Sequence, residues 1–288
     1  MRPRSGVSTA GAFGFLGPNG SGKTTTIGML VGTIKPTGGS FNLFGASGPE
    51  GLMAARARVG ATLETPNFYP YMSGRDNLRV AAAVKGVGRP RIGECLELAG
   101  LSGRANHRFK TYSLGMKQRL ALAATMLNDP ELIILDEPAN GLDPQGIREI
   151  REIIGILADR GKTIFLSSHL LAEVERTCSH VAIIREGRIV TWGAVADVVG
   201  EGRAVLLRAK EMEALAGAME SYPDATSVRR TGDGVVAALR VEDYAGVTRY
   251  LAGRGIYLSH LAPYRPSLED VFIDATRGAA DSMTEIAS

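Results

Sequence analysis

The amino-acid sequence predicts an α/β protein with a largely parallel sheet, followed by a smaller α+β domain. A glycine-rich loop at 17–24 stands between an apolar run and a helical pattern. Apolar runs then alternate with amphipathic helical patterns as far as about residue 200, and the remaining pattern has the order βαββαβ. The 288 residues are enough for one large domain with a small companion.

Composition sets limits on the class of protein. The 44% hydrophobic and 22% charged residues are typical of a globular protein, and a net charge of +3 is too small to indicate a nucleic-acid partner. No apolar run approaches the roughly 20 residues that span a bilayer. The first residues also lack the apolar core of a signal peptide, so we expect the protein to be located in the cytoplasm. Cys95 and Cys178 are expected to be buried thiols.

The loop at 17–24 fits the phosphate-binding pattern of Gly, four residues, and Gly-Lys-Ser/Thr. Its glycines allow successive N–H groups to point at a phosphate, and the helix that follows directs its positive end at the same anion. Lys23 is expected on the β and γ phosphates and the Thr24 hydroxyl on Mg²⁺. A glycine-rich surface loop is the alternative. The expected nucleotide-binding residues are Gly17, Pro18, Asn19, Gly20, Ser21, Gly22, Lys23, Thr24 and Thr25.

The elements around this loop follow from local patterns. Residues 1–11 have little periodicity and are expected to be a frayed lead-in. The apolar run 12–16 predicts a strand and 25–31 a helix, and a turn rich in Gly and Pro then leads to strands at 40–44 and 58–63.

A helical subdomain is predicted between about 65 and 128, because the apolar spacing there becomes helical. The apolar run 132–135, which ends in Asp136 and Glu137, predicts a buried parallel strand. The elements expected next are a helix at 147–160, a strand at 163–167, a helix at 170–177, and strands at 181–184 and 188–191 joined by a Glu186-Gly187 turn. These residues complete a first domain of 1–200.

A small accessory domain is predicted for 201–277, with a disordered tail at 278–288. Its pattern favours a ferredoxin-like fold, and a helix capped by Ser267 is expected from there to 275. A ligand sensor, a dimer brace and simple packing all remain open as its role. The elements are strands at 204–209, 225–230, 235–239 and 256–261, with helices at 211–219 and 243–253.

Two acidic residues stand where the run 132–135 ends. From that place Asp136 can reach the Mg²⁺ of a phosphate-loop site. If the strand continued, Glu137 would point the other way, which suits a base or an orienter of the attacking water. A solvated strand edge or a cap is the alternative, and the phosphate loop on the same sheet disfavours it.

Three further segments resemble motifs of ATP-binding cassette (ABC) ATPases. Residues 112–119, Tyr-Ser-Leu-Gly-Met-Lys-Gln-Arg, resemble the signature motif; 140–143, Asn-Gly-Leu-Asp, resemble the D-loop; and 167–169, Ser-Ser-His, resemble the H-loop. With Walker A at 17–24 and Walker B at 132–137, five motifs occur in the family's order. The form of the signature and the Pro-Ser-Leu-Glu-Asp-Val-Phe ending at 266–272 resemble exporters that include drug-, bacitracin- and lantibiotic-resistance transporters.

The resemblance implies a head-to-tail dimer that encloses two ATP molecules. Ser113 and the Gly115 amide would then bind the γ-phosphate held by the partner copy's loop. Glu137 would polarise water, His169 would contact the γ-phosphate, and Asp143 would link the two sites. Outside this set of motifs, Ser113 would be interpreted as a helix cap and His169 as an ordinary histidine at a strand end.

Some positions depart from the family pattern. Glu64 stands where the Q-loop usually has Gln, and it can still ligate a hard cation. Leu114 and Met116 replace the Gly and Gln of the commonest signature, as in the exporter branch that the chain resembles. The family has two strands and an adenine-stacking aromatic before the loop, for which Phe13 and Phe15 are poor substitutes. We therefore expect the true start codon to lie upstream. The alternative is that the chain binds nucleotide weakly and folds with an exposed sheet edge.

The resemblance therefore implies an ATPase subunit, using ATP and Mg²⁺, that drives export of a drug, antibiotic, peptide or lipid-like substrate. Its expected partners are a second copy of itself and a separate multi-spanning permease, with no nucleic acid, at the inner face of the cell membrane. A cassette protein acting on ribosomes or DNA is the alternative, and the single motif set without heptads disfavours it. A kinase or GTPase would have no use for the signature.

Overall fold

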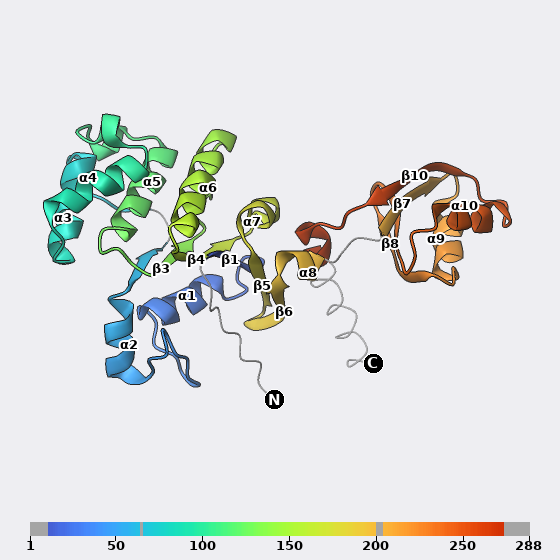
Figure 1. Ribbon diagram of the computed structural model, residues 1–288, viewed down its shortest axis with the longest axis horizontal. Coiled ribbons are helices and arrows are strands. Elements are labelled where there is room, and N and C mark those ends of the chain that lie inside the picture. The colour runs from blue at the N-terminus through green and yellow to red at the C-terminus, as the bar shows by residue number, and fades with distance from the viewer. Residues whose placement is uncertain (1–10, 64–65, 200–203, 274–288) are drawn as a thin grey trace. The chain divides into compact units, whose positions relative to one another are not determined.

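The computed structural model describes residues 11–63, 66–199 and 204–273 (Figure 1). Residues 1–10 of the predicted lead-in, Glu64 and the predicted tail lie outside the described residues, and Gly11 is the first residue of a strand. The chain divides into two compact units, Met1–Val195 and Ala196–Ser288, and each is described by itself. No helix among the described residues is long and apolar enough to cross a bilayer.

A six-stranded sheet forms the centre of the first unit, with the order β2-β3-β4-β1-β5-β6. The first five strands in this order are parallel, and β6 pairs antiparallel with β5, as predicted. Because β1 and β3 lie inside the sheet, nearly all their side chains are buried. The strands are β1 Gly11–Leu16, β2 Val59–Thr62, β3 Leu132–Asp136, β4 Thr163–Ser168, β5 His180–Arg185 and β6 Arg188–Ala194.

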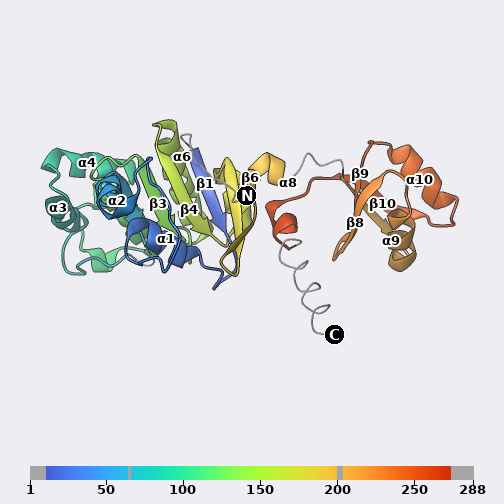
Figure 2. The same cartoon turned by 90° about the horizontal axis from the view of Figure 1, so that it is seen from below.

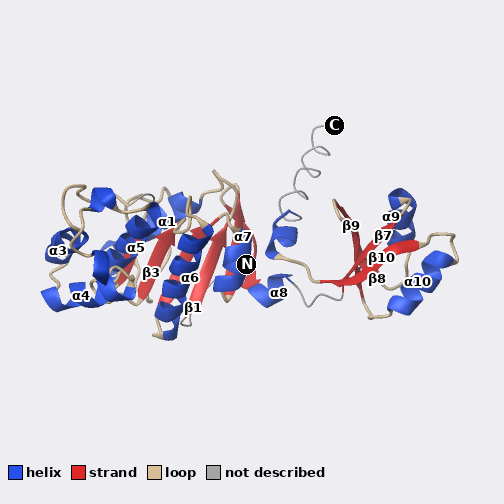
Figure 3. Cartoon of the chain, turned by 90° about the horizontal axis from the view of Figure 1, so that it is seen from above, coloured by secondary structure: helices blue, strands red, loops and turns tan. Residues whose placement is uncertain are grey.

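Helices cover both faces of this sheet. Figures 1 and 3 show α6 (Pro144–Asp159) and α7 (Leu171–Thr177) on one face, and Figure 2 shows α1 (Lys23–Val31) on the other. Along α6 the buried residues are spaced three or four apart, so the helix presents one apolar side. A short helix, α8 (Val195–Val199), follows β6.

The predicted helical subdomain is present between β2 and β3. It contains α3 (Gly74–Val84), α4 (Arg89–Leu98) and α5 (Leu114–Thr125), with 3₁₀ turns at Ser102–Arg104 and Phe109–Thr111. The hydroxyl of Ser73 accepts a hydrogen bond from Asp76 N–H and so caps α3.

The prediction of a strand at 40–44 was wrong. That segment forms only an isolated bridge between Leu43 and Ala46, because Phe44 and Gly45 have positive φ angles of 53° and 79° that turn the chain back. A helix that was not predicted, α2 (Gly48–Arg56), follows directly. Its glycines and proline had the composition of a turn, although proline suits the first turn of a helix.

The second unit has the ferredoxin-like fold that the sequence predicted. Its four strands have the order β10-β7-β9-β8, and all neighbours are antiparallel. The two helices pack on one face of the sheet, where Val205, Leu207, Val235 and Ala237 are fully buried. The elements are β7 Ala204–Ala209, α9 Met212–Glu220, β8 Ala225–Thr231, β9 Gly234–Leu239, α10 Tyr244–Ala252 and β10 Leu258–Tyr264.

A helical turn at 268–273 begins where it was predicted. Ser267 Oγ accepts from Asp270 N–H, and the Asp270 carboxylate accepts from Ser267 N–H, so the two residues form a reciprocal cap. The predicted continuation to 275 lies outside the described residues.

Candidate nucleotide-binding site

The glycine-rich loop connects β1 to α1 in a conformation that depends on its glycines. Gly20 and Gly22 have φ angles of 79° and 106°, which residues with a Cβ rarely adopt. A Cβ at Gly17 would lie 2.4 Å from the carbonyl oxygen of Ile184. Ser21 is buried, and its hydroxyl has no hydrogen-bond partner among the described residues. The exposed rim of the loop consists of Pro18, Asn19 and Gly20, and Thr24 and Thr25 are exposed at the start of α1.

Lys23 is buried within this loop, with 6% of its surface exposed. Its ammonium group donates hydrogen bonds to the carbonyl oxygens of Gly17 (2.8 Å) and Pro18 (3.3 Å) and lies 3.5 Å from Glu137 Oε1. A buried cation at the amino end of a helix concentrates positive charge in one place. The geometry and charge of the loop therefore suit an anion.

Asp136 joins the loop to the end of β3. Its carboxylate accepts hydrogen bonds from Thr24 Oγ1 (2.9 Å) and Ser167 Oγ (2.5 Å). Hydroxyl and carboxylate oxygens are the ligands that Mg²⁺ prefers. The structure thus brings together the two described residues that the sequence proposed for metal binding, and their chemistry fits that ion.

Glu137 lies between Lys23 and His169. Its Oε2 is 2.7 Å from His169 Nδ1, and its Oε1 faces the Lys23 ammonium. The strand does not continue through Glu137: β3 ends at Asp136, and Glu137 has a φ of 49°. The turn of the backbone, rather than strand alternation, therefore directs the two neighbouring carboxylates to different partners.

Sequence reasoning did not single out Ser167 as a site residue. Its buried hydroxyl donates to Asp136 and accepts a hydrogen bond of 3.0 Å from Glu137 N–H. The signal is the strand register, in which Ser167 pairs with Asp136 across β3 and β4. The register can be predicted only if it is known that β3 and β4 are neighbours in the sheet.

Ser113, Gly115 and Asp143 form a second group. Ser113 caps α5 by accepting from Met116 N–H, and Asp143 caps α6 by accepting from Gly146 N–H; both residues are exposed. The two helix starts are adjacent, since a Cβ on Gly115 would lie 3.8 Å from Gly146 Cα. Within the described part of the chain, no hydrogen bond or ion pair joins this group to the glycine-rich loop.

The two phenylalanines of β1 belong to the core. Phe13 is stacked on His180, and Phe15 packs against Phe165. Their side chains are 7% and 4% exposed, so neither is free to stack on a base, in agreement with the expectation from sequence.

Comparison with known proteins identifies the family. A profile of the family described as "ABC transporter" matches residues 6–140. The uncharacterized ABC transporter ATP-binding protein YhcH of Bacillus subtilis (strain 168) is 40% identical over 267 residues, which cover 92% of this chain and 86% of that protein. The chain belongs to the ABC transporter family. It is an ATP-binding subunit of the family and an ATPase, as predicted.

Two further similarities concern transport and fold. The bacitracin transport ATP-binding protein BcrA of Bacillus licheniformis is 37% identical to this ABC subunit over 279 residues, covering 94% of this chain and 90% of that protein. The structure of cbiO1 from Clostridium perfringens, part of the ABC transporter complex cbiONQ, matches with a TM-score of 0.61 at 26% identity. The match covers 66% of this chain and 79% of that chain and agrees with the predicted fold.

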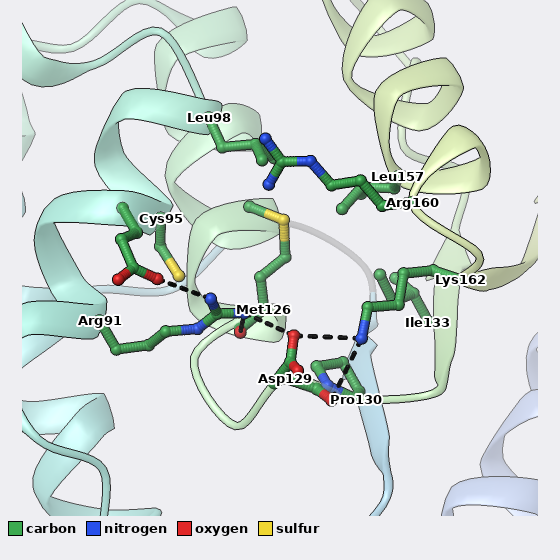
Figure 4. Close-up of a pocket in the computed structure, with 11 residues that line it drawn as sticks. Arg91, Cys95, Leu98, Met126, Asp129, Pro130, Ile133, Leu157, Arg160 and Lys162 are labelled. Atoms are coloured by element: carbon green, nitrogen blue, oxygen red, sulfur yellow. Dashed lines mark hydrogen bonds and ion pairs between the residues drawn. The ribbon is translucent and has the colours of Figure 1, made fainter.

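A separate hollow of about 70 Å³ lies at the other end of β3 in this ABC subunit (Figure 4). Asp129 pairs there with Arg91 (2.7 Å) and Lys162 (3.1 Å), and the Lys162 hydrogen bond lowers the pKa of its carboxyl group. Cys95 also lines the hollow, and burial raises the pKa of its thiol. Because Asp129 already has two cationic partners, we interpret the hollow as a structural joint between α4 and the sheet.

Proposed function

We propose that this ABC subunit binds MgATP at the glycine-rich loop and hydrolyses it with Glu137, and that it drives an exporter. The observation that carries the proposal is the cluster in which the Glu137 carboxylate meets both Lys23 and His169. A carboxylate beside a phosphate-binding lysine is well placed to orient or deprotonate the attacking water.

The binding roles follow from the geometry of the loop. Backbone N–H groups of residues 17–24 and the start of α1 would surround the phosphates. When ATP enters, Lys23 would exchange its carbonyl partners for phosphate oxygens. Thr24 and Asp136 would hold Mg²⁺, which neutralises phosphate charge when bound. Glu64 remains a predicted third ligand.

In the chemical step, water attacks the γ-phosphorus while the bond to the bridging oxygen of ADP breaks. Glu137 would accept the water's proton, and His169 would fix the Glu137 carboxylate and contact the γ-phosphate. Lys23 would stabilise the negative charge of the transferring group. Ser167 would act as a positioning residue, because it touches both Asp136 and the Glu137 backbone.

A second copy of the chain would complete each site. Ser113 and Gly115 lie at an exposed helix start, next to Asp143. An exposed helix start is suited to bind the γ-phosphate held by another copy, and Asp143 would connect the two sites.

Similarity to a bacitracin transport protein supports the exporter role. We propose that a separate membrane-spanning subunit recognises the substrate, a drug, antibiotic, peptide or lipid-like molecule, and holds this chain at the inner face of the membrane. Similarity to a member of an ABC transporter complex supports such a partner. We further propose that residues 1–200 act as the ATPase domain and 201–277 as a structural or regulatory domain.

Substitution of Glu137 tests the mechanism. Glu137→Gln keeps the size and polarity of the side chain but cannot accept a proton, so we expect ATPase activity to fall by roughly 10²- to 10⁴-fold while MgATP still binds. The variant should accumulate as an ATP-bound dimer, measured by light scattering after size-exclusion chromatography. Lys23→Ala is the control that should lose binding. A Glu137→Gln protein that stays monomeric at saturating MgATP contradicts the sandwich.

The exporter role needs its own test. When the tagged chain is purified from solubilised membranes, a multi-spanning protein should co-purify with it at a constant ratio to the chain. Recovery of ribosomes in its place would favour the alternative function.

A further inference from the structure

Glu137 and His169 meet at the candidate site from two separate segments of the chain. Glu137 follows β3 and lies in the turn that leads to α6, whereas His169 follows β4 and lies in the short turn before α7. Their contact of 2.7 Å therefore depends on where α6 and α7 lie on the sheet. Figures 1 and 3 show these two helices next to each other on one face of the sheet.

The two sides of this contact are held differently. The backbone N–H of Glu137 donates to the buried hydroxyl of Ser167, which fixes the backbone that carries the carboxylate. The His169 side chain is 44% exposed, and the one hydrogen-bond partner of its ring among the described residues is Glu137 itself. The histidine therefore depends on α7 for its position.

Helix α7 has little to orient it from within. It has seven residues, and its N-cap residue Leu170 makes no side-chain cap. A helix that is stable alone needs roughly 12–15 residues. Val174 is 1% exposed and packs against β1, where a Cβ on Gly14 would overlap the Val174 side chain. This apolar contact keeps α7 on the sheet, but the hydrophobic effect is not directional.

One ion pair gives α7 an orientation. The guanidinium of Arg151, on α6, donates a hydrogen bond of 3.2 Å to Glu173 Oε2. Glu173 lies in the first turn of α7, four residues after His169, and its N–H donates to the carbonyl oxygen of Leu170. Because a charge-assisted hydrogen bond has a preferred geometry, this pair resists rotation of the helix.

The packing between α6 and α7 is otherwise incomplete. Residues of both helices and of β4 line a second hollow, of about 30 Å³, and Arg151 and Glu173 are among them. The lining of a hollow lacks contacts on one side, so it resists movement weakly. The ion pair is thus the polar link that the structure describes between the two helices.

We propose that Arg151 is a positioning residue for ATP hydrolysis, and that its ion pair with Glu173 holds His169 against Glu137. The two pairs are bridges between the same two segments of the chain, one at the site and one outside it. Without the outer bridge, α7 would turn about Val174 and carry His169 away from Glu137. The inference rests on the proposed function, in which His169 fixes the Glu137 carboxylate.

Steady-state hydrolysis of MgATP by the purified full-length chain tests the proposal. We expect Arg151→Gln to lower kcat about tenfold and to change the KM for ATP by less than about twofold, because Lys23 and the glycine-rich loop remain intact. Arg151→Lys keeps the cation and should retain most of the wild-type kcat, which guards against a folding artefact.

The chain offers a matched control. Arg176 also faces Glu173, at 3.6 Å, but both residues belong to α7, so that pair joins no second element. Arg176→Gln removes the same charge and leaves Arg151 in place, and its kcat should stay within about twofold of the wild type. Equal losses of kcat for Arg151→Gln and Arg176→Gln would overturn the proposal.

A His169→Ala background separates positioning from general stability. If Arg151 acts through His169, Arg151→Gln should lower the remaining kcat of His169→Ala by less than about twofold. An equal factor in the two backgrounds, or a wild-type kcat for Arg151→Gln beside an impaired His169→Ala, would refute this inference alone. If His169→Ala hydrolyses ATP at the wild-type rate, the proposed role of His169 fails, and the inference fails with it.

Discussion

Ser167 illustrates how one buried hydroxyl organises the candidate nucleotide-binding site. It holds the side chain of Asp136 and the backbone N–H of Glu137 at the same time. The two carboxylates therefore keep separate partners although they are neighbours in sequence.

We expect Ser167→Ala to lower the kcat for ATP at least tenfold and to lower the unfolding free energy by about 1–3 kcal/mol, because buried polar groups lose their partner. Steady-state kinetics and urea unfolding measure the two effects. Ser168→Ala is the control, because among the described residues the Ser168 hydroxyl has one hydrogen bond, which it accepts from Leu170 N–H. Equal kcat values for the two variants would show that Ser167 does not position the carboxylates.

Most residues of the candidate site could be proposed from the sequence because they stand close together in motifs. Lys23 and Thr24 follow the glycines directly, and Asp136 ends an apolar run. The role of Ser167 could not be predicted from the sequence because it depends on the register between two strands. The turn at Glu137 could not be predicted either, because no residue type in the sequence indicates its positive φ angle.

At the scale of elements, the start of α5 has two roles that a substitution can separate. Asp caps a helix as well as Ser does, but its charge would repel a phosphate. We expect Ser113→Asp to keep the unfolding free energy within about 0.5 kcal/mol and to lower ATPase activity by roughly 100-fold. Ser113→Asn, a neutral cap, should lose far less activity. If Ser113→Asp hydrolyses ATP normally, Ser113 is only a cap.

The structural joint between α4 and the sheet, where Asp129 pairs with Arg91 and Lys162, should give stability a small pH dependence. Because the pKa of Asp129 is lowered in the folded state, its contribution to stability exists above the ordinary value of 3.8 and disappears as pH falls through the lower folded value. We expect Asp129→Asn to cost less than about 1 kcal/mol at pH 7, because the side chain is 65% exposed, and progressively less below pH 3.8.

Urea unfolding at several pH values measures this difference. The control is Asp159→Asn, which replaces an exposed acid at the end of α6. It should show no such pH-dependent loss of unfolding free energy. A cost for Asp129→Asn that grows as pH falls would contradict the assignment.

Strong periodicity made most elements predictable, and tertiary context decided the others. The order and type of elements in the second unit followed from its βαββαβ pattern. The segment 40–44 alternated like a strand but has no neighbouring strand to pair with beyond an isolated bridge. Helix α2 buries only Ala55, so it carries little of the apolar periodicity that predicts a helix.

At the scale of the whole molecule, the two units have separate cores, and only the first contains the glycine-rich loop. MgATP at 100 times its Kd should therefore stabilise the first unit by about 2.7 kcal/mol. In calorimetry we expect one transition to rise by about 5–10 °C and the other to stay in place. Lys23→Ala should abolish the rise. A single transition that shifts as a whole would show that the units unfold together.

Trp192 is the sole tryptophan of the sequence, and half of its surface faces solvent on β6. The hairpin that carries it turns at Gly187, whose N–H donates to the Ser21 carbonyl within the glycine-rich loop. The fluorescence of this one indole therefore originates in a hairpin that is hydrogen-bonded to the loop that we propose binds ATP. The native protein carries its own optical probe, and stopped-flow records of nucleotide arrival need no attached dye.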